Sequence, residues 1–128
     1  MSEQEIPNYW PGGCFGCSQI NEHGLKLPFW KTEKGCYTRC AMPHHLCGID
    51  GVVHGGILTL ILEEVAQWTI ISHFAKFGMT RDISVRYLKP VPTNMEILVE
   101  AQITSQNERD ISFRSTITDP NGQLLTPA

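Results

Sequence analysis

Hydrophobic residues occupy nearly every face of one long segment in the middle of the chain. Between Gly56 and about Phe77, apolar residues leave little polar surface at any helical angle, which is typical of a helix enclosed on several sides. Gly78 follows this segment and is expected to end the helix. The pattern therefore predicts one long, largely buried helix.

Segments rich in β-branched residues flank this helix. One short strand is predicted before it, at residues 35–42, and three after it, at residues 82–91, 95–106 and 109–119. Alternation is clearest in the last, where Ile111, Phe113 and Ile117 fall on one side of the strand with Ser115. Turns are predicted at residues 90–94 and 119–122. This order predicts the α+β class, with an antiparallel sheet packed on one dominant helix.

Composition and charge narrow the range of functions. The 128 residues suit one domain, here placed at 14–128 behind an irregular lead-in at residues 1–13. A net charge of −3 argues against broad attachment to nucleic acid. No membrane span and no signal peptide are expected. Five cysteines, an odd number, favour reduced thiols and a cytoplasmic location over a disulfide framework.

Polar residues interrupt the helix at a spacing of four. Thr59, Glu63 and Gln67 stack on one face, and Glu64 points about 100° away from Glu63. A buried carboxylate is costly unless it is paired or hydrogen-bonded, so a buried stripe needs partners. Spacing alone leaves two other readings open, a solvated face and a subunit interface.

A histidine and two glycines stand at the expected start of the helix. Glycines at Gly55 and Gly56 allow close backbone approach and present free N–H groups to an anion or a developing oxyanion. His54 can donate to a ligand, orient the loop or cap the helix. The histidine and glycine triplet alone is a weak signal for a functional site. It becomes more specific because a carboxylate, Glu63, follows nine residues after His54.

Four stretches together resemble the hotdog-fold acyl-CoA thioesterases of the phenylacetyl-CoA (PaaI-like) type. They are CFGCSQINEHGL (14–25), GVVHGG (51–56) with its later glutamate, ISVRYLKPVP (83–92) and DPNGQLL (119–125). The resemblance implies a hotdog fold, in which the sheet wraps the helix and two subunits share each active site. It implies a homodimer or a homotetramer, an acyl-CoA substrate and no cofactor.

The resemblance also implies roles for single residues. Glu63 is expected to be the general base or nucleophile of thioester hydrolysis, and the Gly55 N–H to polarise the carbonyl beside Gly56. His54 is expected to shape the site, and Gln67 to hold the attacking water near Thr59. Because the net charge offers no general attraction, the phosphates of CoA are expected to meet a few cations, and the candidates are Arg81, Arg86 and Lys89.

The sequence departs from the family in two places. Glu63 replaces the more usual aspartate, and Gly48 stands where some members carry an amide side chain. Two alternatives therefore stay open, a hotdog hydroxyacyl dehydratase or hydratase and a non-catalytic acyl-CoA-binding protein. The first lacks the D-x-x-x-x-H spacing, because Asp50 precedes His54 by four residues.

The remaining candidates for metal chemistry are cysteines and histidines. Cys14 and Cys17, followed by Cys36 and Cys40, superficially match four-thiolate zinc spacing. The second pair falls in a predicted strand, however, and relatives carry the first pair without it, so no metal is expected. Cys47 is interpreted as a small apolar residue, and His44 and His45 as exposed loop residues.

Overall fold

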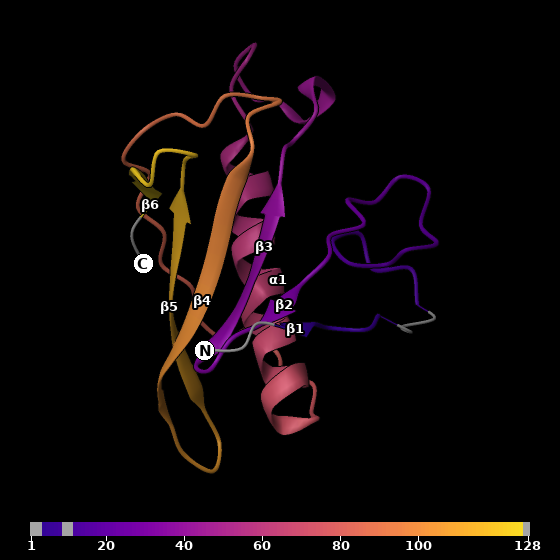
Figure 1. Ribbon diagram of the computed structural model, residues 1–128, viewed down its shortest axis with the longest axis vertical. Helices are drawn as coiled ribbons and strands as arrows, with labels where there is room; N and C mark the ends of the chain where they lie inside the picture. Colours follow the sequence, from indigo (N-terminus) through magenta and orange to yellow (C-terminus); the bar gives the residue numbers. More distant parts are fainter. Residues whose placement is uncertain (1–3, 9–11, 127–128) are drawn as a thin grey trace.

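A six-stranded antiparallel sheet with one long helix along it forms the molecule, as Figure 1 shows. The computed structural model describes residues 4–8 and 12–126. The strands are neighbours in chain order: β1 (Gln4–Glu5), β2 (Trp30–Lys31), β3 (Gly35–Cys40), β4 (Ile97–Gln106), β5 (Ile111–Thr118) and β6 (Leu124–Thr126). The helix α1 (Gly55–Phe74) and the short 3-10 helix η1 (His44–Leu46) lie between β3 and β4 in the chain. The predicted α+β architecture is confirmed.

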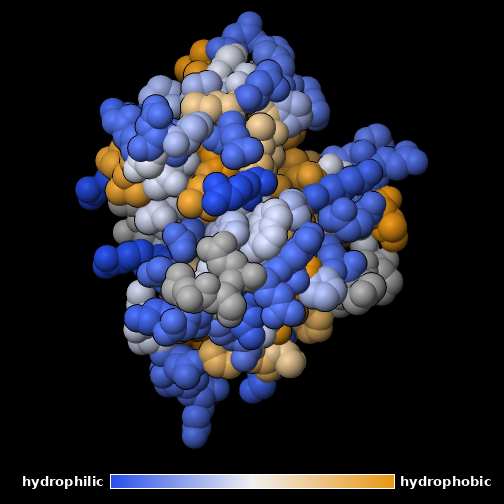
Figure 2. Space-filling model, in the orientation of Figure 1, coloured by the Kyte–Doolittle hydropathy of each residue, from blue (hydrophilic) through white to orange (hydrophobic). Residues whose placement is uncertain are grey.

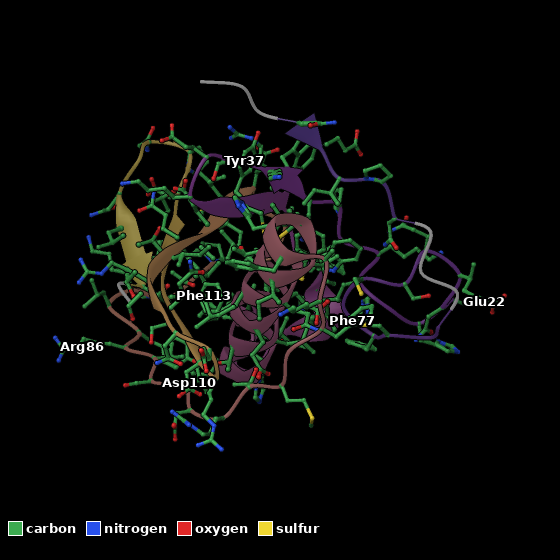
Figure 3. The ribbon with its side chains drawn as sticks, turned by 90° about the horizontal axis from the view of Figure 1, so that it is seen from below. Glu22, Tyr37, Phe77, Arg86, Asp110 and Phe113 are labelled. Carbon is green, nitrogen blue, oxygen red and sulfur yellow. The ribbon has the colours of Figure 1, made fainter. Side chains whose placement is uncertain are left out.

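The core lies between α1 and the middle strands of the sheet. The side of the helix that faces the sheet is fully apolar apart from Thr69, and β3, β4 and β5 supply the opposing residues. Burial of such side chains stabilises the fold by about 1.5–3 kcal/mol each. The predicted alternation in β5 is also confirmed, because Phe113 points towards the helix (Figure 3) while Arg114 is exposed. The main core residues are Leu58, Ile61, Leu62, Val65, Trp68, Cys36, Val99, Ala101 and Ile117.

A glycine fixes the closest approach of β3 to β4. A Cβ atom on Gly35 would lie 1.7 Å from the carbonyl oxygen of Ala101, so no other residue fits without moving a strand. Gly35 pairs with Gln102 and Cys40 pairs with Ile97, which sets the register of the two strands. This pairing holds the two ends of the α1 insertion together.

The end of the helix differs from the prediction. Helix α1 ends at Phe74, and Ala75 caps it in the left-handed region at φ 54° with its N–H on the carbonyl of Ile71. Gly78 has another role, because a Cβ there would lie 2.8 Å from the side chain of Ile70. This glycine allows the chain after the helix to fold back closely against it.

The prediction of a strand at residues 82–91 is wrong. The segment is irregular and runs past the edge of the sheet, where the N–H groups of Leu88 and Lys89 both point at the carbonyl of Leu125 in β6, at 2.9 and 3.4 Å. One shared acceptor cannot form a ladder. In addition, Pro90 and Pro92 carry no N–H to extend the pairing. The β-branched residues therefore give an extended backbone without a paired strand.

Other boundaries differ by a few residues. The strands predicted at 35–42, 95–106 and 109–119 are shorter, and Gln4 and Glu5 pair with β2 inside a lead-in expected to be irregular. The predicted turn at 119–122 is confirmed, with the Gly122 N–H on the carbonyl of Asp119 at 2.9 Å. Within the described ranges no helix is long and apolar enough to cross a membrane. Figure 2 shows a mostly hydrophilic face with small hydrophobic patches.

Candidate active site

The start of α1 is built around His54. Its Nδ1 accepts a hydrogen bond from the Gly56 N–H at 2.8 Å, so the imidazole caps its own helix. The carbonyl of His54 accepts the first bonds of the helix, from Ile57 and Leu58. Among the described residues the Gly55 N–H has no acceptor, and it lies at the positive end of the helix dipole. This N–H is available to a carbonyl oxygen of a ligand.

Tyr87 covers this glycine, a contact that no pattern in the sequence predicted. Its hydroxyl donates to the carbonyl of Gly55 at 2.8 Å and lies 2.5 Å from the hydroxyl of Thr59. A Cβ on Gly55 would come within 3.3 Å of the tyrosine ring, so the glycine makes room for it. Thr59 therefore belongs to the helix start and anchors Tyr87 there. An aromatic residue in a predicted strand gave no signal of this contact.

Glu63 is the unpartnered member of the polar stripe. Gln67 accepts the Gly78 N–H at 3.4 Å, and Thr59 meets Tyr87. Among the described residues, by contrast, none forms a hydrogen bond or ion pair with the Glu63 carboxylate. Its side chain is half-buried and lines a cavity of about 620 Å³. A half-buried carboxylate without a partner is costly in a purely structural role, so it is the strongest candidate for chemistry.

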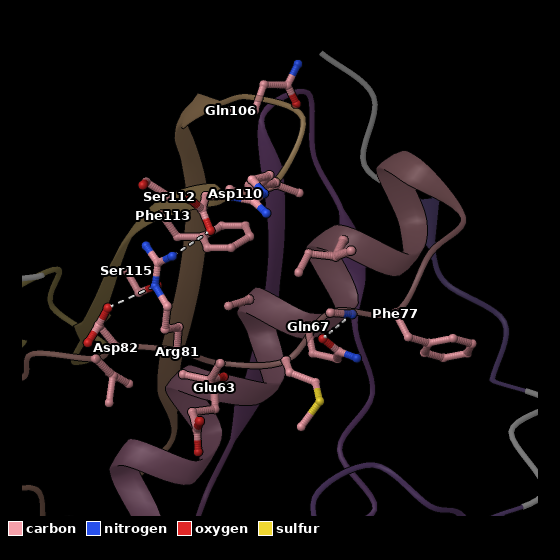
Figure 4. Close-up of a pocket in the computed structure, with 18 of the residues that line it drawn as sticks. Glu63, Gln67, Phe77, Arg81, Asp82, Gln106, Asp110, Ser112, Phe113 and Ser115 are labelled. Carbon is pink, nitrogen blue, oxygen red and sulfur yellow. Dashed lines mark hydrogen bonds and ion pairs between the residues drawn. The ribbon is translucent and has the colours of Figure 1, made fainter.

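The cavity lies between α1, the segment after the helix and β5. Figure 4 shows Glu63 and Gln67 on the helix side, with Phe113 and Ser115 of β5 facing them. Arg81 stands at one side, paired with Asp110 at 3.1 Å and with Asp82 at 3.2 Å. Apolar side chains supply much of the remaining wall, namely Leu62, Ala66, Ile70, Phe74, Ile83 and Val85. A hydrophobic group beside a carboxylate fits this space.

One chain does not bring all the predicted site residues together. Glu63, Gln67 and Arg81 line the cavity, whereas His54, Gly55, Gly56 and Thr59 do not. Gly55 and Glu63 are eight residues apart on one helix, which separates them by about 12 Å along its axis. A single carbonyl cannot be reached by both groups at that separation.

The two other predicted cations lie outside the cavity. Arg86 and Lys89 are exposed, and Figure 3 shows Arg86 pointing away from the helix at the edge of the molecule. They follow Arg81 along the same irregular segment. Arg81 is engaged by two carboxylates, so these two are the cations of the segment that carry no ion pair among the described residues.

The two pairs of cysteines lie in different environments. Cys36 in β3 donates to the carbonyl of Val65 at 3.0 Å, and burial raises the pKa of its thiol to about 12. Burial likewise raises the pKa of Cys40 to about 12. Cys14 and Cys17 instead face Glu64, on a different side of α1 from the cavity. The four thiols do not form one cluster.

Comparison with known proteins identifies the family. The family model of the thioesterase superfamily matches residues 50–126. The acyl-coenzyme A thioesterase THEM4 of Mus musculus is 28% identical over 81 residues, which is 63% of this chain and 34% of the mouse protein. The chain thus spans about a third of the length of this curated relative.

Solved structures share the fold at low sequence identity. A hypothetical thioesterase of Streptococcus pneumoniae with coenzyme A has a TM-score of 0.72 and 19% identity, over 79% of each chain. The protein smu.793 of Streptococcus mutans, bound to acetyl CoA, has a TM-score of 0.73 and 17% identity, over 86% of this chain and 90% of that one. The family match includes α1 and every later strand, so this chain belongs to the thioesterase superfamily and has the hotdog fold.

Proposed function

We propose that this protein hydrolyses the thioester bond of an acyl-CoA and is of the PaaI-like type. The observation that carries the proposal is the carboxylate of Glu63, which has no partner among the described residues and lines a cavity together with apolar side chains. Membership of the thioesterase superfamily and the acyl-CoA thioesterase name of the mouse relative support it. The cavity receives the acyl group, and its apolar wall favours a hydrophobic one.

Each step needs a group that the chain provides. Glu63 takes a proton from water as the water attacks the thioester carbonyl, or it attacks directly to give an anhydride that water then opens. The free N–H of Gly55 stabilises the oxyanion that forms on the carbonyl oxygen. The C–S bond then breaks, and the CoA sulfur leaves and gains a proton. His54 and Gly56 hold the helix start in shape for this contact.

The site is shared between two subunits in this proposal. Because Gly55 and Glu63 of one chain are about 12 Å apart, the glycine of one subunit serves the carboxylate of another. In the segment after the helix, Ile83, Tyr87 and Leu88 are each nearly half-exposed, at 48%, 47% and 49%. A second copy of the chain would cover these side chains. We therefore propose a homodimer, alone or within a homotetramer.

The nucleotide end of the substrate is held by local positive charge. Arg86 and Lys89 are free to meet phosphates, whereas Arg81 would first have to leave Asp82 and Asp110. The five cysteines are unpaired thiols, which supports a proposed location in the reducing cytoplasm.

The rival hydratase chemistry finds less support in the site. A hydratase needs a histidine base with an acidic partner, but Nδ1 of His54 caps the helix. Asp50 contacts His44 at 3.1 Å and not His54. The proposed thioesterase and its rival are separated by their products, a free thiol in one case and an enoyl-CoA in the other.

The test is a panel of acyl-CoA substrates with thiol release and dehydration followed in parallel. Glu63→Gln keeps the size of the side chain and removes its charge, so kcat should fall by roughly 10² or more. Glu33→Gln, at an exposed carboxylate in the β2–β3 turn, is the matched control and should leave the rate unchanged. Normal hydrolysis by folded Glu63→Gln protein would overturn the proposal. Dehydration without thiol release would favour the rival.

A further inference from the structure

Two thiols and a carboxylate meet on a side of α1 that the proposed reaction does not use. The sulfur atoms of Cys14 and Cys17 and a carboxylate oxygen of Glu64 all lie within 4.8 Å of one another. The Cys14 Sγ is 3.6 Å from Oε1 of Glu64. None of the three lines the cavity of Glu63. The cluster joins the N-terminal loop, residues 12–29, to the middle of the helix.

The loop is built to hold this arrangement. The Ser18 N–H donates to the carbonyl of Cys14 at 3.0 Å, and the Asn8 side chain donates to the carbonyl of Cys17 at 2.6 Å. Gly16, between the two cysteines, is buried, and a Cβ there would lie 2.6 Å from Cγ of Glu64. Only a glycine at this position lets the carboxylate reach both thiols. The geometry therefore depends on backbone bonds and close packing, not on loose surface side chains.

The cluster lacks positive charge. Among the described residues Glu64 forms no ion pair with a lysine or arginine. Three groups that can each become anionic thus face one another, and a bound cation is what would stabilise them together.

The indole of Trp68 adds an independent observation. Its N–H is buried and has no acceptor within the described ranges, although most buried donors are satisfied. The same indole lies beside the side chain of Cys17. A permanently deprotonated sulfur at Cys17 would give the indole N–H the acceptor that it lacks. Metal coordination is the ordinary way to keep a buried thiol deprotonated.

We propose that Cys14, Cys17 and Glu64 bind a zinc ion that joins the N-terminal loop to helix α1. With Zn–S bonds of about 2.3 Å and Zn–O bonds of about 2.0 Å, a tetrahedral ion spaces sulfur and oxygen by about 3.5 Å. The measured 3.6 Å between Cys14 and Glu64 agrees with this spacing. On binding, the thiols lose their protons to solvent, and a fourth position is left to water or an added ligand.

A second cluster shows why burial matters for this inference. His44, Cys47 and Asp50 also place three possible ligands together. The side chains of His44 and Asp50 are 64% and 91% exposed, so water already solvates them. Cys47 is therefore the matched control for the buried thiols.

The experiment measures metal binding by the whole chain, stripped with a chelator and kept reduced. Titration with Co²⁺ should give one ion per chain and a thiolate-to-cobalt charge-transfer band, and Zn²⁺ should displace it. Cys17→Ser should weaken Zn²⁺ binding on the order of a hundredfold. Glu64→Gln, nearly isosteric, should weaken it less, and Cys47→Ser should leave it unchanged. Zn²⁺ should raise the Tm of the wild type and of Cys47→Ser but not of Cys17→Ser.

Several results would overturn the inference. One such result is that the wild-type protein takes up no more Zn²⁺ than the Cys17→Ser variant. Another is that Cys47→Ser weakens Zn²⁺ binding as much as Cys17→Ser does. The inference would also be refuted if Cys14 and Cys17 form a disulfide and the protein binds no Co²⁺ after that disulfide has been reduced. If Cys17→Ser does not fold, Cys14→Ser at the half-buried thiol and Glu64→Gln carry the same test. The outcome is independent of whether the protein hydrolyses thioesters.

Discussion

Mixing two inactive variants should restore activity to a calculable level. Glu63→Gln removes the proposed base, and Gly55→Pro removes the N–H proposed to stabilise the oxyanion. Proline is tolerated at the first position of a helix, and the extended backbone of His54, at φ −60° and ψ 134°, suits a following proline. Each variant alone should lose roughly 10² or more in kcat.

The expected recovery follows from the separation of the two groups. Gly55 and Glu63 of one chain are about 12 Å apart, so in the proposed dimer each site takes one group from each subunit. Random mixing of equal amounts makes half of the dimers mixed, and each mixed dimer has one intact site of two. The mixture should therefore reach about one quarter of wild-type activity.

The assay follows thiol release from an acyl-CoA after subunits have exchanged, with exchange measured by mass spectrometry of tagged chains. Gly55→Ala is the control for bulk, because it adds the Cβ that approaches Tyr87 but keeps the N–H. It should stay more active than Gly55→Pro. Complete exchange with activity still at the level of the parents would refute the shared site.

Three further outcomes are expected. Lys89→Ala and Arg86→Ala should each raise KM for acyl-CoA roughly ten- to a hundredfold with little change in kcat, since a charge-assisted contact contributes about 1.5–3 kcal/mol. Neither change should affect a short thioester without the nucleotide. Gly35→Ala should lower the free energy of unfolding by about 3 kcal/mol in urea titration, whereas Gly13→Ala, with open space around it, should change it little. Iodoacetamide at pH 8 should leave Cys36 unmodified until the protein unfolds, because burial raises the pKa of its thiol to about 12. Labelling of Cys36 in the folded protein, detected by peptide mass mapping, would contradict this.

The long helix and the antiparallel sheet packed on it were predictable, because hydrophobic patterning directly encodes which faces are buried. The end of the helix was not, because Ala75 carries no local signal for a left-handed cap and Gly78 is needed for packing on Ile70. Residues 82–91 show a similar limit. Their composition predicts an extended backbone, but a strand also needs a partner. Among the described residues, Leu125 alone accepts backbone hydrogen bonds from the N–H groups of this segment.

Some residues of the candidate site were likewise predictable from the sequence, and others were not. Glu63 and Gly55 stood out because a carboxylate and a glycine are unusual in so apolar a helix. Tyr87 gave no signal, because an aromatic residue in an extended segment usually indicates sheet packing. Glu64 and the two cysteines meet across fifty positions of the chain, as the Cys14–Glu64 contact shows, and no spacing rule pairs such residues.

The adjacency of β3 and β4 has a consequence for how the chain folds. Every residue of β3 pairs with β4, over residues 97–102, although α1 and both of its loops lie between Cys40 and Ile97. Closing so long a loop costs about 2 kcal/mol more in chain entropy than closing the short β4–β5 hairpin. The β4–β5–β6 meander is therefore the local part of the topology and forms early, while the pairing of β3 onto β4 waits until α1 has collapsed on the hairpin. Until that step the free edge of β4 is open to other chains, so refolding yield should fall as protein concentration rises.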